Sequence, residues 1–427
     1  MPSEEVTGSA AASHPSSAEV VLVGIGADGW SGLTSSAMAL IEKARVVIGG
    51  QRQLDLLPDA IAAERVPWPS PLRPAVHELV ERHRSGGLVV LASGDPMLFG
   101  IGRALVEELG SQSLRVLPHP SSISLACARL GWPVEDTEVV SLVGRPLASL
   151  TMSLHHRRRL LVLSNGAATP GEVAKLLTDK GFGGSTLTVL EQLGASAEAR
   201  RSGVAEQWDT THADLGDPLN VVAVECSQGP LASRLGLVPG LADAAYEDDG
   251  QLTKREVRAV TMSSLAPAPG ELLWDIGGGA GSIAIEWMRS HRNCRAIAVE
   301  SDNDRAARIG RNAQTLGVPG LRIVIGRAPL VLAQLPTPDA IFIGGGLTAE
   351  GMLDTAWAAL KTGGRLVANT VTLESEVVLA QWYARHGGEL IRIATSRAKA
   401  LGGFTGWQQA MPVTHWSVTK PHDAQID

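Results

Sequence analysis

A largely apolar run that ends in closely spaced glycines constrains this chain more than any other feature. The run spans 271–276 and is followed by Gly277, Gly279 and Gly281. An apolar run of this length that ends in glycines predicts a buried strand, a tight turn and a helix that begins near Gly281. Glycine lets the backbone of such a turn come close to a ligand, because a Cβ would block the approach. The segment therefore predicts a ligand-binding loop at the edge of an α/β sheet.

Two acidic residues distinguish this loop from an ordinary glycine turn. Asp275 stands two residues before the first glycine, and Glu300 ends the next predicted strand, at 295–300. An acid at the end of that second strand commonly binds the hydroxyls of a ribose. Both acids together are typical of Rossmann-like methyltransferases that use S-adenosylmethionine (SAM), whereas a plain turn between a strand and a helix requires neither. We therefore predict a SAM site that includes Asp275, Gly277, Gly279, Gly281 and Glu300.

The composition is that of a globular protein with more than one domain. At 427 residues the chain is longer than one ordinary domain, and 44% hydrophobic with 19% charged residues is typical of soluble proteins. No apolar run is as long as a membrane span, and residues 1–18, rich in Ser and Ala, predict a disordered tail without a targeting signal. Cys127, Cys226 and Cys294 fit no metal or disulfide spacing and are expected to be buried. We therefore expect a cytoplasmic protein that holds no metal.

Strand and helix signals alternate in different ways along the chain. Over 19–132 short apolar runs alternate with helices, which predicts a mostly parallel α/β lobe. Over 133–226 the strands have fewer helices between them, which predicts a more antiparallel lobe, and 227–245 is predicted to be a linker. Over 246–420 seven predicted strands separated by helices indicate another α/β domain, whose first helix we expect to begin with a capping box formed by Thr253 and Glu256.

The N-terminal half carries several characteristic loops in order. Its first loop, 24–29, matches a dinucleotide-binding pattern by itself, but the acid expected at the end of the next strand is missing. Together the loops resemble the tetrapyrrole methylase family, in particular its precorrin-6 C5 methylases; the match covers about 19–226 and rests on 23–29, 47–52, 93–100, 120–122 and 143–145. The resemblance implies a two-lobed fold that binds SAM through Gly94, Asp95, Pro96, Ser121 and Ser122, with Gly24 and Gly26 facing the substrate.

The C-terminal half is similar to the decarboxylating C15 methylases of the same pathway. The similarity covers about 246–420 and rests on 252–258, 275–286, 326–329, 342–346, 369–374 and 396–398. It implies a seven-stranded Rossmann-like fold in which Thr253, Gly326 and Ala328 also contact SAM, and in which Gly344, Gly345 and Gly346 leave room for a flat macrocycle. Relatives usually carry an acid where this chain has Arg327, so we assign no adenine contact to that side chain.

The two resemblances together imply a bifunctional enzyme of cobalamin biosynthesis. It would methylate precorrin-6B at C5 and C15 with SAM and decarboxylate the C12 acetate, giving precorrin-8. Methyl transfer to an electron-rich ring carbon needs orientation more than a strong base, so we assign no catalytic acid or base. The remaining carboxylates of the substrate favour cationic anchors, for which the candidates are Arg258, Arg397 and Lys399. For each of them a solvated surface charge is the alternative interpretation.

Other functions are less consistent with the residues. A methyltransferase that acts on RNA or on another small metabolite is the main alternative; a dinucleotide oxidoreductase and a non-catalytic SAM sensor are two more. The net charge of −7 disfavours broad nucleic-acid binding, and the chain lacks the polar-Pro-Pro-aromatic motif with which amino-methylases of nucleic acids hold a base. We therefore expect a precorrin as partner, with no nucleic acid and no membrane. The resemblance also implies a homo-oligomer, in particular a tetramer.

Overall fold

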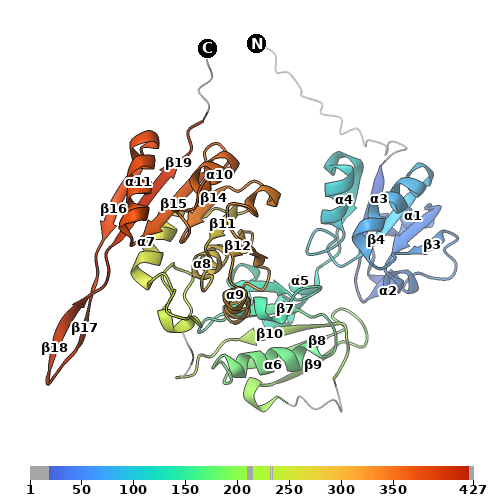
Figure 1. The fold of residues 1–427 in the computed structure, drawn as a ribbon. Helices are drawn as coiled ribbons and strands as arrows, with labels where there is room; N and C mark the ends of the chain where they lie inside the picture. Colours follow the sequence, from blue (N-terminus) through green and yellow to red (C-terminus); the bar gives the residue numbers. More distant parts are fainter. Residues whose placement is uncertain (1–18, 209–214, 231, 233, 423–427) are drawn as a thin grey trace, which may run out of the picture. The chain divides into compact units, whose positions relative to one another are not determined.

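The chain forms two compact units. The computed structural model describes residues 19–422 apart from 209–214, 231 and 233, so the predicted N-terminal tail lies outside the described residues. Unit 1 runs up to Gly144 and again over His156–Gln228, and unit 2 comprises Arg145–His155 and the chain from Gly229 onward. Figure 1 shows the elements of both units in sequence colours.

The first lobe of unit 1 is a parallel sheet with helices. Its strand order is β3-β2-β4-β1-β5, and every pairing between these strands is parallel. All residues of β1 are buried, as expected for a parallel strand covered on both faces. The elements are β1 (Val20–Ile25), β2 (Val46–Gly49), β3 (Glu64–Pro67), β4 (Leu88–Ser93), β5 (Leu114–Leu117), α1 (Ser35–Glu42), α2 (Gln51–Asp55), α3 (Leu72–His83), α4 (Gly102–Leu109) and α5 (Ser122–Leu130).

The second lobe of unit 1 is mostly antiparallel. Its order is β6-β7-β10-β8-β9, in which only the β6–β7 pair among these described strands is parallel. The elements are β6 (Thr137–Ser141), β7 (Arg159–Leu163), β8 (Thr186–Glu191), β9 (Ala199–Val204), β10 (Asn220–Glu225) and α6 (Thr169–Asp179). The predicted change from a parallel to a more antiparallel lobe is confirmed.

Unit 2 contains the seven-stranded sheet predicted for the C-terminal half. Within the described residues its order is β13-β12-β11-β14-β15-β19-β16, with β19 antiparallel to both of its neighbours and the other pairings parallel. The strands are β11 (Leu272–Ile276), β12 (Arg295–Glu300), β13 (Arg322–Ile325), β14 (Ala340–Ile343), β15 (Arg365–Thr370), β16 (Glu389–Ile393) and β19 (Val413–Thr419). The helices are α7 (Arg255–Leu265), α8 (Ser282–Ser290), α9 (Asn303–Thr315), α10 (Met352–Ala359) and α11 (Leu373–His386).

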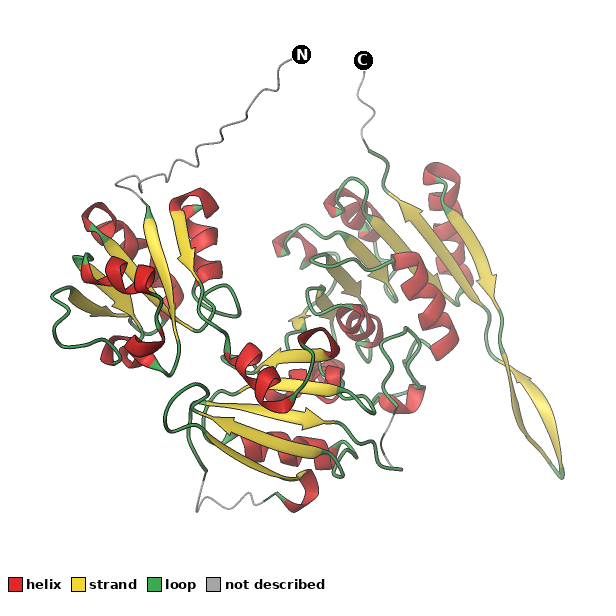
Figure 2. Cartoon of the chain, turned by 180° about the vertical axis from the view of Figure 1, so that it is seen from behind, coloured by secondary structure: helices red, strands yellow, loops and turns green. Residues whose placement is uncertain are grey.

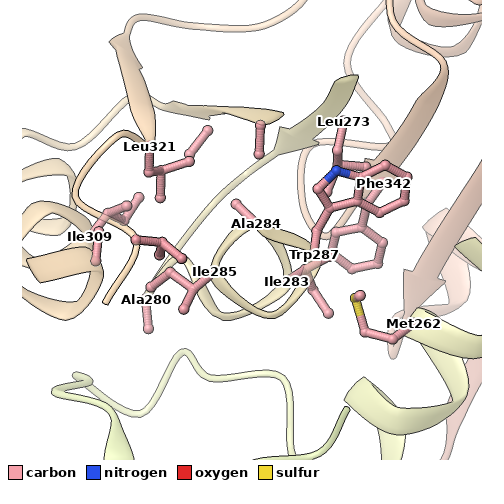
Figure 3. Packing of buried hydrophobic residues seen from close by; sticks show 14 of the residues in the cluster. Met262, Leu273, Ala280, Ile283, Ala284, Ile285, Trp287, Ile309, Leu321 and Phe342 are labelled. Carbon is pink, nitrogen blue, oxygen red and sulfur yellow. The ribbon is translucent and has the colours of Figure 1, made fainter. Parts of the chain in front are cut away.

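Alternation along the strands of unit 2 sends side chains to two separate cores. Leu272, Trp274 and Ile276 of β11 pack in the core on the α10 and α11 face, while Leu273 packs in the core on the face of α7, α8 and α9. Figure 2 shows helices on both faces of this sheet. In Figure 3, Trp287 of α8 lies beside Leu273 and Phe342. This alternation also turns Asp275 toward α8, on the same face as Leu273.

Two segments of unit 2 were not predicted. Residues 145–155, from the middle of the N-terminal half, belong to unit 2, where Met152 packs against the core that contains α8 and α9. The hairpin of β17 (Ser396–Leu401) and β18 (Phe404–Gln409) extends away from the seven-stranded sheet (Figure 1). All residues of β17 are exposed, so the hairpin, which we call the arm, lacks the apolar alternation that identifies a strand in a sequence.

A buried carboxylate fastens the chain before α7 to α8. Glu286 accepts hydrogen bonds from the backbone N–H of Gly240 (2.6 Å) and Leu241 (3.1 Å), from the hydroxyl of Tyr246 (3.0 Å) and from Nε of Arg258 (2.8 Å). These donors are either fixed backbone groups or buried side chains, so the second part of the predicted linker is packed onto unit 2.

The predicted capping box is wrong. Helix α7 begins at Arg255, and its N-cap residue, Lys254, makes no side-chain capping hydrogen bond. Glu256 pairs with Arg397 of the arm at 2.5 Å. The spacing of Thr253 and Glu256 fits a capping box, but the Glu256 carboxylate pairs instead with Arg397, which is distant in the sequence.

Three further observations concern the cysteines, the helices and the metal-binding side chains of the described residues. All three cysteines are free and buried, as predicted. No helix in the described ranges is long and apolar enough to cross a membrane. The described His, Cys, Asp and Glu side chains form no group that could hold a metal ion.

Glu286→Gln is expected to destabilise unit 2 strongly. The amide keeps the shape but removes the charge that Arg258 needs and turns a donor toward other donors, at a cost of about 3–5 kcal/mol. The measurement is the urea unfolding midpoint of the full chain. The control is Glu256→Gln, which breaks an exposed ion pair worth about 1 kcal/mol at most. Equal midpoints for the two variants would contradict the role of Glu286.

Candidate functional site

The larger cleft lies in unit 2 at the carboxyl ends of the parallel strands. It has a volume of about 920 Å³, and its walls come from the loops after β11, β12, β13, β14 and β15, from the start of α7 and from the base of the arm. Loops at the carboxyl ends of parallel strands meet at one edge of a sheet, which is where α/β proteins bind ligands. The predicted residues that line it are Thr253, Asp275, Gly277, Gly279, Glu300, Gly326, Ala328, Gly344, Gly345 and Gly346.

The glycine loops after β11 and β14 touch through their backbones. Gly277 has a φ of +76°, and a Cβ there would lie 2.9 Å from the backbone nitrogen of Gly345. Both the left-handed conformation and the close approach therefore require glycine at this position. Gly345 itself has open space where its Cβ would be. The floor of the cleft is thus bare backbone, which can lie directly against a ligand.

Asp275 presents a buried acceptor without a protein partner. Its Oδ2 accepts a hydrogen bond from the backbone N–H of Ala284 at 3.0 Å, while its Oδ1 has no partner among the described residues. The carboxyl group is 1% exposed. Burial, together with the nearby charge of Glu300, raises the pKa of Asp275 to about 7, although the bond from Ala284 opposes the shift. A ligand that donates a hydrogen bond to Oδ1 would therefore satisfy this group.

Glu300 closes the other side of the glycine loop. Its Oε2 accepts from the N–H of Gly279 at 2.9 Å, and its Oε1 accepts from the N–H groups of Ser301 and Asp302 at 2.8 and 3.0 Å. These bonds hold the carboxylate in one orientation at the end of β12. Oε2 accepts only one of these bonds and can accept a second, so Glu300 remains able to bind a hydroxyl group.

The smaller cleft lies within unit 1. It has a volume of about 410 Å³ and is lined by residues from both lobes of that unit. Of the predicted residues Gly26, Gly94, Asp95, Ser121 and Ser122 line it. Its polar groups are mainly backbone and small side chains: Ser121 caps α5 by accepting from the N–H of Ser124 at 3.1 Å, and Asp95 accepts from the N–H of Met97 at 2.9 Å. Leucines from the second lobe make the opposite wall apolar.

Three residues predicted to contact a ligand lie behind the lining of the clefts. A Cβ on Gly24 would collide with the carbonyl oxygen of Gly94 and the N–H of His119, so Gly24 packs the loops together rather than facing the substrate. Gly281 is the N-cap residue of α8 and lies against Ile309. Pro96 accepts a backbone bond from Gly102 instead of lining the cleft.

The predicted substrate anchors have different outcomes. Arg258 is fully buried and is occupied by Glu286, Asp243 and the backbone carbonyls of Thr253 and Leu241, so its prediction as an anchor is wrong. Its charge is balanced by the buried carboxylate of Glu286, a pairing that the sequence alone did not reveal. Arg397 and Lys399 lie on the exposed arm and outside the lining of the cleft.

Other cations line the clefts instead. Lys254 and Arg327 line the cleft of unit 2, and the side chain of neither has a hydrogen-bond or ion-pair partner within the described chain. In unit 1, Arg52 lines the cleft and donates to the hydroxyl of Ser93 at 2.9 Å. Each of these cations falls inside or beside a motif on which the resemblances rest, and that proximity was the sequence signal that could have identified them.

Comparison with known proteins agrees with both halves of the chain. Residues 19–209 match the family of tetrapyrrole (corrin/porphyrin) methylases, and residues 244–420 match the precorrin methyltransferase domain. The chain is 52% identical to the precorrin-6Y C(5,15)-methyltransferase [decarboxylating] of Sinorhizobium sp, over 94% of this chain and 96% of that protein. The protein of that name from Mycobacterium tuberculosis H37Rv is 46% identical, over 94% of this chain and 100% of its own.

A solved structure is similar to the C-terminal part. The C-terminal domain of precorrin-6Y C5,15-methyltransferase from Rhodobacter capsulatus has 47% sequence identity and a TM-score of 0.42, and it covers 43% of this chain and 100% of its own.

The pKa of Asp275 predicts a specific pH dependence of stability. Because burial raises this pKa from 3.8 to about 7, the folded chain keeps a proton that the unfolded chain releases, so stability falls as pH rises from about 4 to about 7. Asp275→Asn removes this component, which amounts to about 4 kcal/mol at most. Urea unfolding of both ligand-free proteins at pH 5 and pH 8 measures the part of this component that is lost above pH 5, since other groups contribute equally to the two. Identical pH dependence of wild type and variant would contradict the prediction.

Proposed function

Because the chain belongs to the family of decarboxylating precorrin-6Y C(5,15)-methyltransferases, we propose that its two clefts are two active sites on one chain. The chain is a decarboxylating methyltransferase of cobalamin biosynthesis. In our proposal the cleft of unit 1 methylates C5 of precorrin-6B. The cleft of unit 2 methylates C15 and decarboxylates the C12 acetate, which releases carbon dioxide and leaves a methyl group at C12, giving precorrin-8. The observation that supports one active site in each unit is that each unit has its own cleft, with a glycine-containing loop in its wall.

We propose SAM as the cofactor of both clefts. The methyltransferase activity of the family supports it, and the residues of the larger cleft fit it. Asp275 Oδ1, buried and without a partner, would accept an N–H of the amino-acid part, and Glu300 would accept the ribose hydroxyls. The bare backbone at Gly277 and Gly345 would lie against the nucleoside. In the smaller cleft Gly94, Asp95, Ser121 and Ser122 would hold the cofactor.

The role of the protein in methyl transfer is mainly to orient the reactants. SAM supplies a methyl group on a sulfonium, and the ring carbon that receives it gives up its proton. Alignment of the two reacting atoms can contribute about 7–11 kcal/mol, without a strong base. Phe342, Leu347 and Met352 line the cleft of unit 2 and would exclude water from the reacting carbon. The glycines at 344–346 would leave room for the flat ring.

The substrate carboxylates need cationic partners. We propose that Lys254 and Arg327 in unit 2, and Arg52 in unit 1, bind them, because these cations line the clefts. Arg397 and Lys399 remain proposals as outer contacts, since both are exposed on the arm. A cytoplasmic location is also proposed; free thiols, as in this chain, are typical of a reducing compartment.

The proposed reaction is tested by an accurate mass of the product. Purified full-length chain is incubated with SAM and precorrin-6B. We expect a product that has gained two methyl groups and lost one carbon dioxide. A single added methyl group without loss of carbon dioxide would contradict the activity proposed for unit 2. An unchanged substrate in the presence of bound SAM would contradict the proposed substrate.

Gly277→Ala is expected to remove one of the two SAM sites. The new Cβ would lie 2.9 Å from the nitrogen of Gly345 and would strain a residue with φ of +76°. Equilibrium dialysis with labelled SAM should show about half of the wild-type cofactor bound per chain, provided that each cleft binds one molecule. The matched control is Gly320→Ala, which lies outside the lining of the cleft and whose Cβ meets open space. Full binding by the Gly277 variant would contradict the assignment.

The arm supports the proposed homo-oligomer. Leu401, Phe404 and Trp407 are exposed on it, and large apolar side chains grouped in this way are typical of a surface that another copy of the chain covers. We expect that the wild type sediments as an oligomer, such as a tetramer. Replacement of Phe404 and Trp407 by Ser should shift the sedimenting species toward the monomer in analytical ultracentrifugation. An unchanged oligomer would show that the arm is not the interface.

A further inference from the structure

Two polar side chains face each other behind the cleft of unit 2. Strands β15 and β19 are antiparallel neighbours, and Asn369 lies directly opposite His415. The alternating residues Ala368 and Trp416 pack on the α10 and α11 face of the sheet, so Asn369 and His415 point to the face covered by α7. His415 is fully buried and also takes part in a polar network.

Hydrogen bonds join these residues to α7 in one continuous chain. The Oγ of Ser264 lies 3.0 Å from Nε2 of His415, and the Nδ1 of His415 lies 2.8 Å from Oδ1 of Asn369. Nδ2 of Asn369 donates to Oγ1 of Thr261 at 2.8 Å. Since Oδ1 of an amide only accepts, Nδ1 of His415 carries the proton, and Nε2 accepts from Ser264.

Burial keeps this histidine neutral. His415 has no exposed surface, and burial lowers its pKa. Across the sheet its side chain meets Asn369 and, from α7, Ser264, and none of these is charged. Glu389 on β16 is the charged group that acts on it, and it opposes the shift. A neutral imidazole with one N–H fixes the direction of the amide.

Asn369 is the member of this network that lines the cleft. Thr261, Ser264 and His415 are not part of the lining. The amide of Asn369 has two N–H bonds, and one of them goes to Thr261. The second has no partner among the described residues, so it is available to a ligand in the cleft.

The strand order separates Asn369 from the nucleoside region. Across the sheet from β12 to β15, these residues come in the order Glu300, Asp275, the glycines after β14, and Asn369. Asn369 therefore lies on the far side of the glycine loop from Glu300. With Thr370, Val371 and the base of the arm, it borders the part of the cleft that remains for the second reactant.

We propose that Asn369 positions the macrocycle in unit 2 by donating its second amide N–H to a carboxylate oxygen of the substrate. His415 is a positioning residue that acts through Asn369, because its N–H holds the amide oxygen and so sets where the free N–H points. This inference rests on the proposed function, which supplies a substrate with several carboxylates. A neutral donor holds a substrate carboxylate in place but stabilises its negative charge less than a cation would.

Two nearly isosteric variants of His415 test the positioning role. The amide nitrogen of Asn can replace Nδ1, and that of Gln can replace Nε2. His415→Asn therefore keeps a donor to Asn369, whereas His415→Gln leaves the oxygen of Asn369 without one. For release of carbon dioxide from precorrin-6B by the full chain, His415→Gln is expected to lower kcat/KM about tenfold, and His415→Asn should restore most of it.

Asn369→Asp tests the donor itself. The carboxylate keeps the shape and the acceptor for His415, but it has no N–H and repels a substrate carboxylate. We expect a loss in kcat/KM of about 100-fold, carried mainly by KM, with SAM binding by equilibrium dialysis unchanged. Thermal unfolding of each variant shows whether the fold is kept.

The outcomes separate this inference from the proposed function. If the wild type releases no carbon dioxide from precorrin-6B, the proposed function fails. If the wild type is active but the Asn and Gln variants of His415 are equally impaired, the positioning role is overturned. The donor role would be overturned if the Asn369→Asp variant had the KM of the wild type. It would also be overturned if this variant lost SAM binding in parallel with activity.

Discussion

The contact of two bare backbone loops at the carboxyl ends of β11 and β14 determines what unit 2 can bind. Because Gly277 and Gly345 meet without side chains between them, a flat surface of peptide groups lies between the acids of β11 and β12 and the amide of β15. The side chains of Asp275, Glu300 and Asn369 line this cleft on either side of that surface. The parallel sheet brings these residues together, since strands distant in the sequence end at the same edge.

Two buried carboxylates of unit 2, Glu286 and Asp275, differ in what surrounds them. Arg258 and Glu286 satisfy each other inside the unit and leave no charge for a ligand. Asp275 is different, because one of its oxygens is buried without a donor. This contrast between a closed pair and an open acceptor separates a stabilising carboxylate from one that is available to a cofactor, although the sequence shows the same kind of residue in both places.

The features that the sequence predicted correctly depend on local pattern. The strand before Gly277, the start of α8 and the seven strands of unit 2 follow from apolar runs and glycines, which act within a few residues. Arg258, Glu256 and Gly24 were misassigned because their partners are far away in the chain: Glu286, Arg397 and the loops at Gly94 and His119. The arm escaped prediction because it is exposed on both faces and therefore has no apolar alternation. The polar network of His415 was not predicted, because its partners come from a neighbouring strand and a helix.

The segment 145–155 has a consequence for how the chain can be divided. It lies in the sequence between two strands of unit 1, yet it belongs to unit 2, where Met152 packs against the core. A cut within 227–245 therefore leaves a piece of unit 2 on the N-terminal fragment and an uncovered apolar surface on the C-terminal one. No single peptide bond divides this chain into its two units, so two separate genes for them would each have to compensate for that segment.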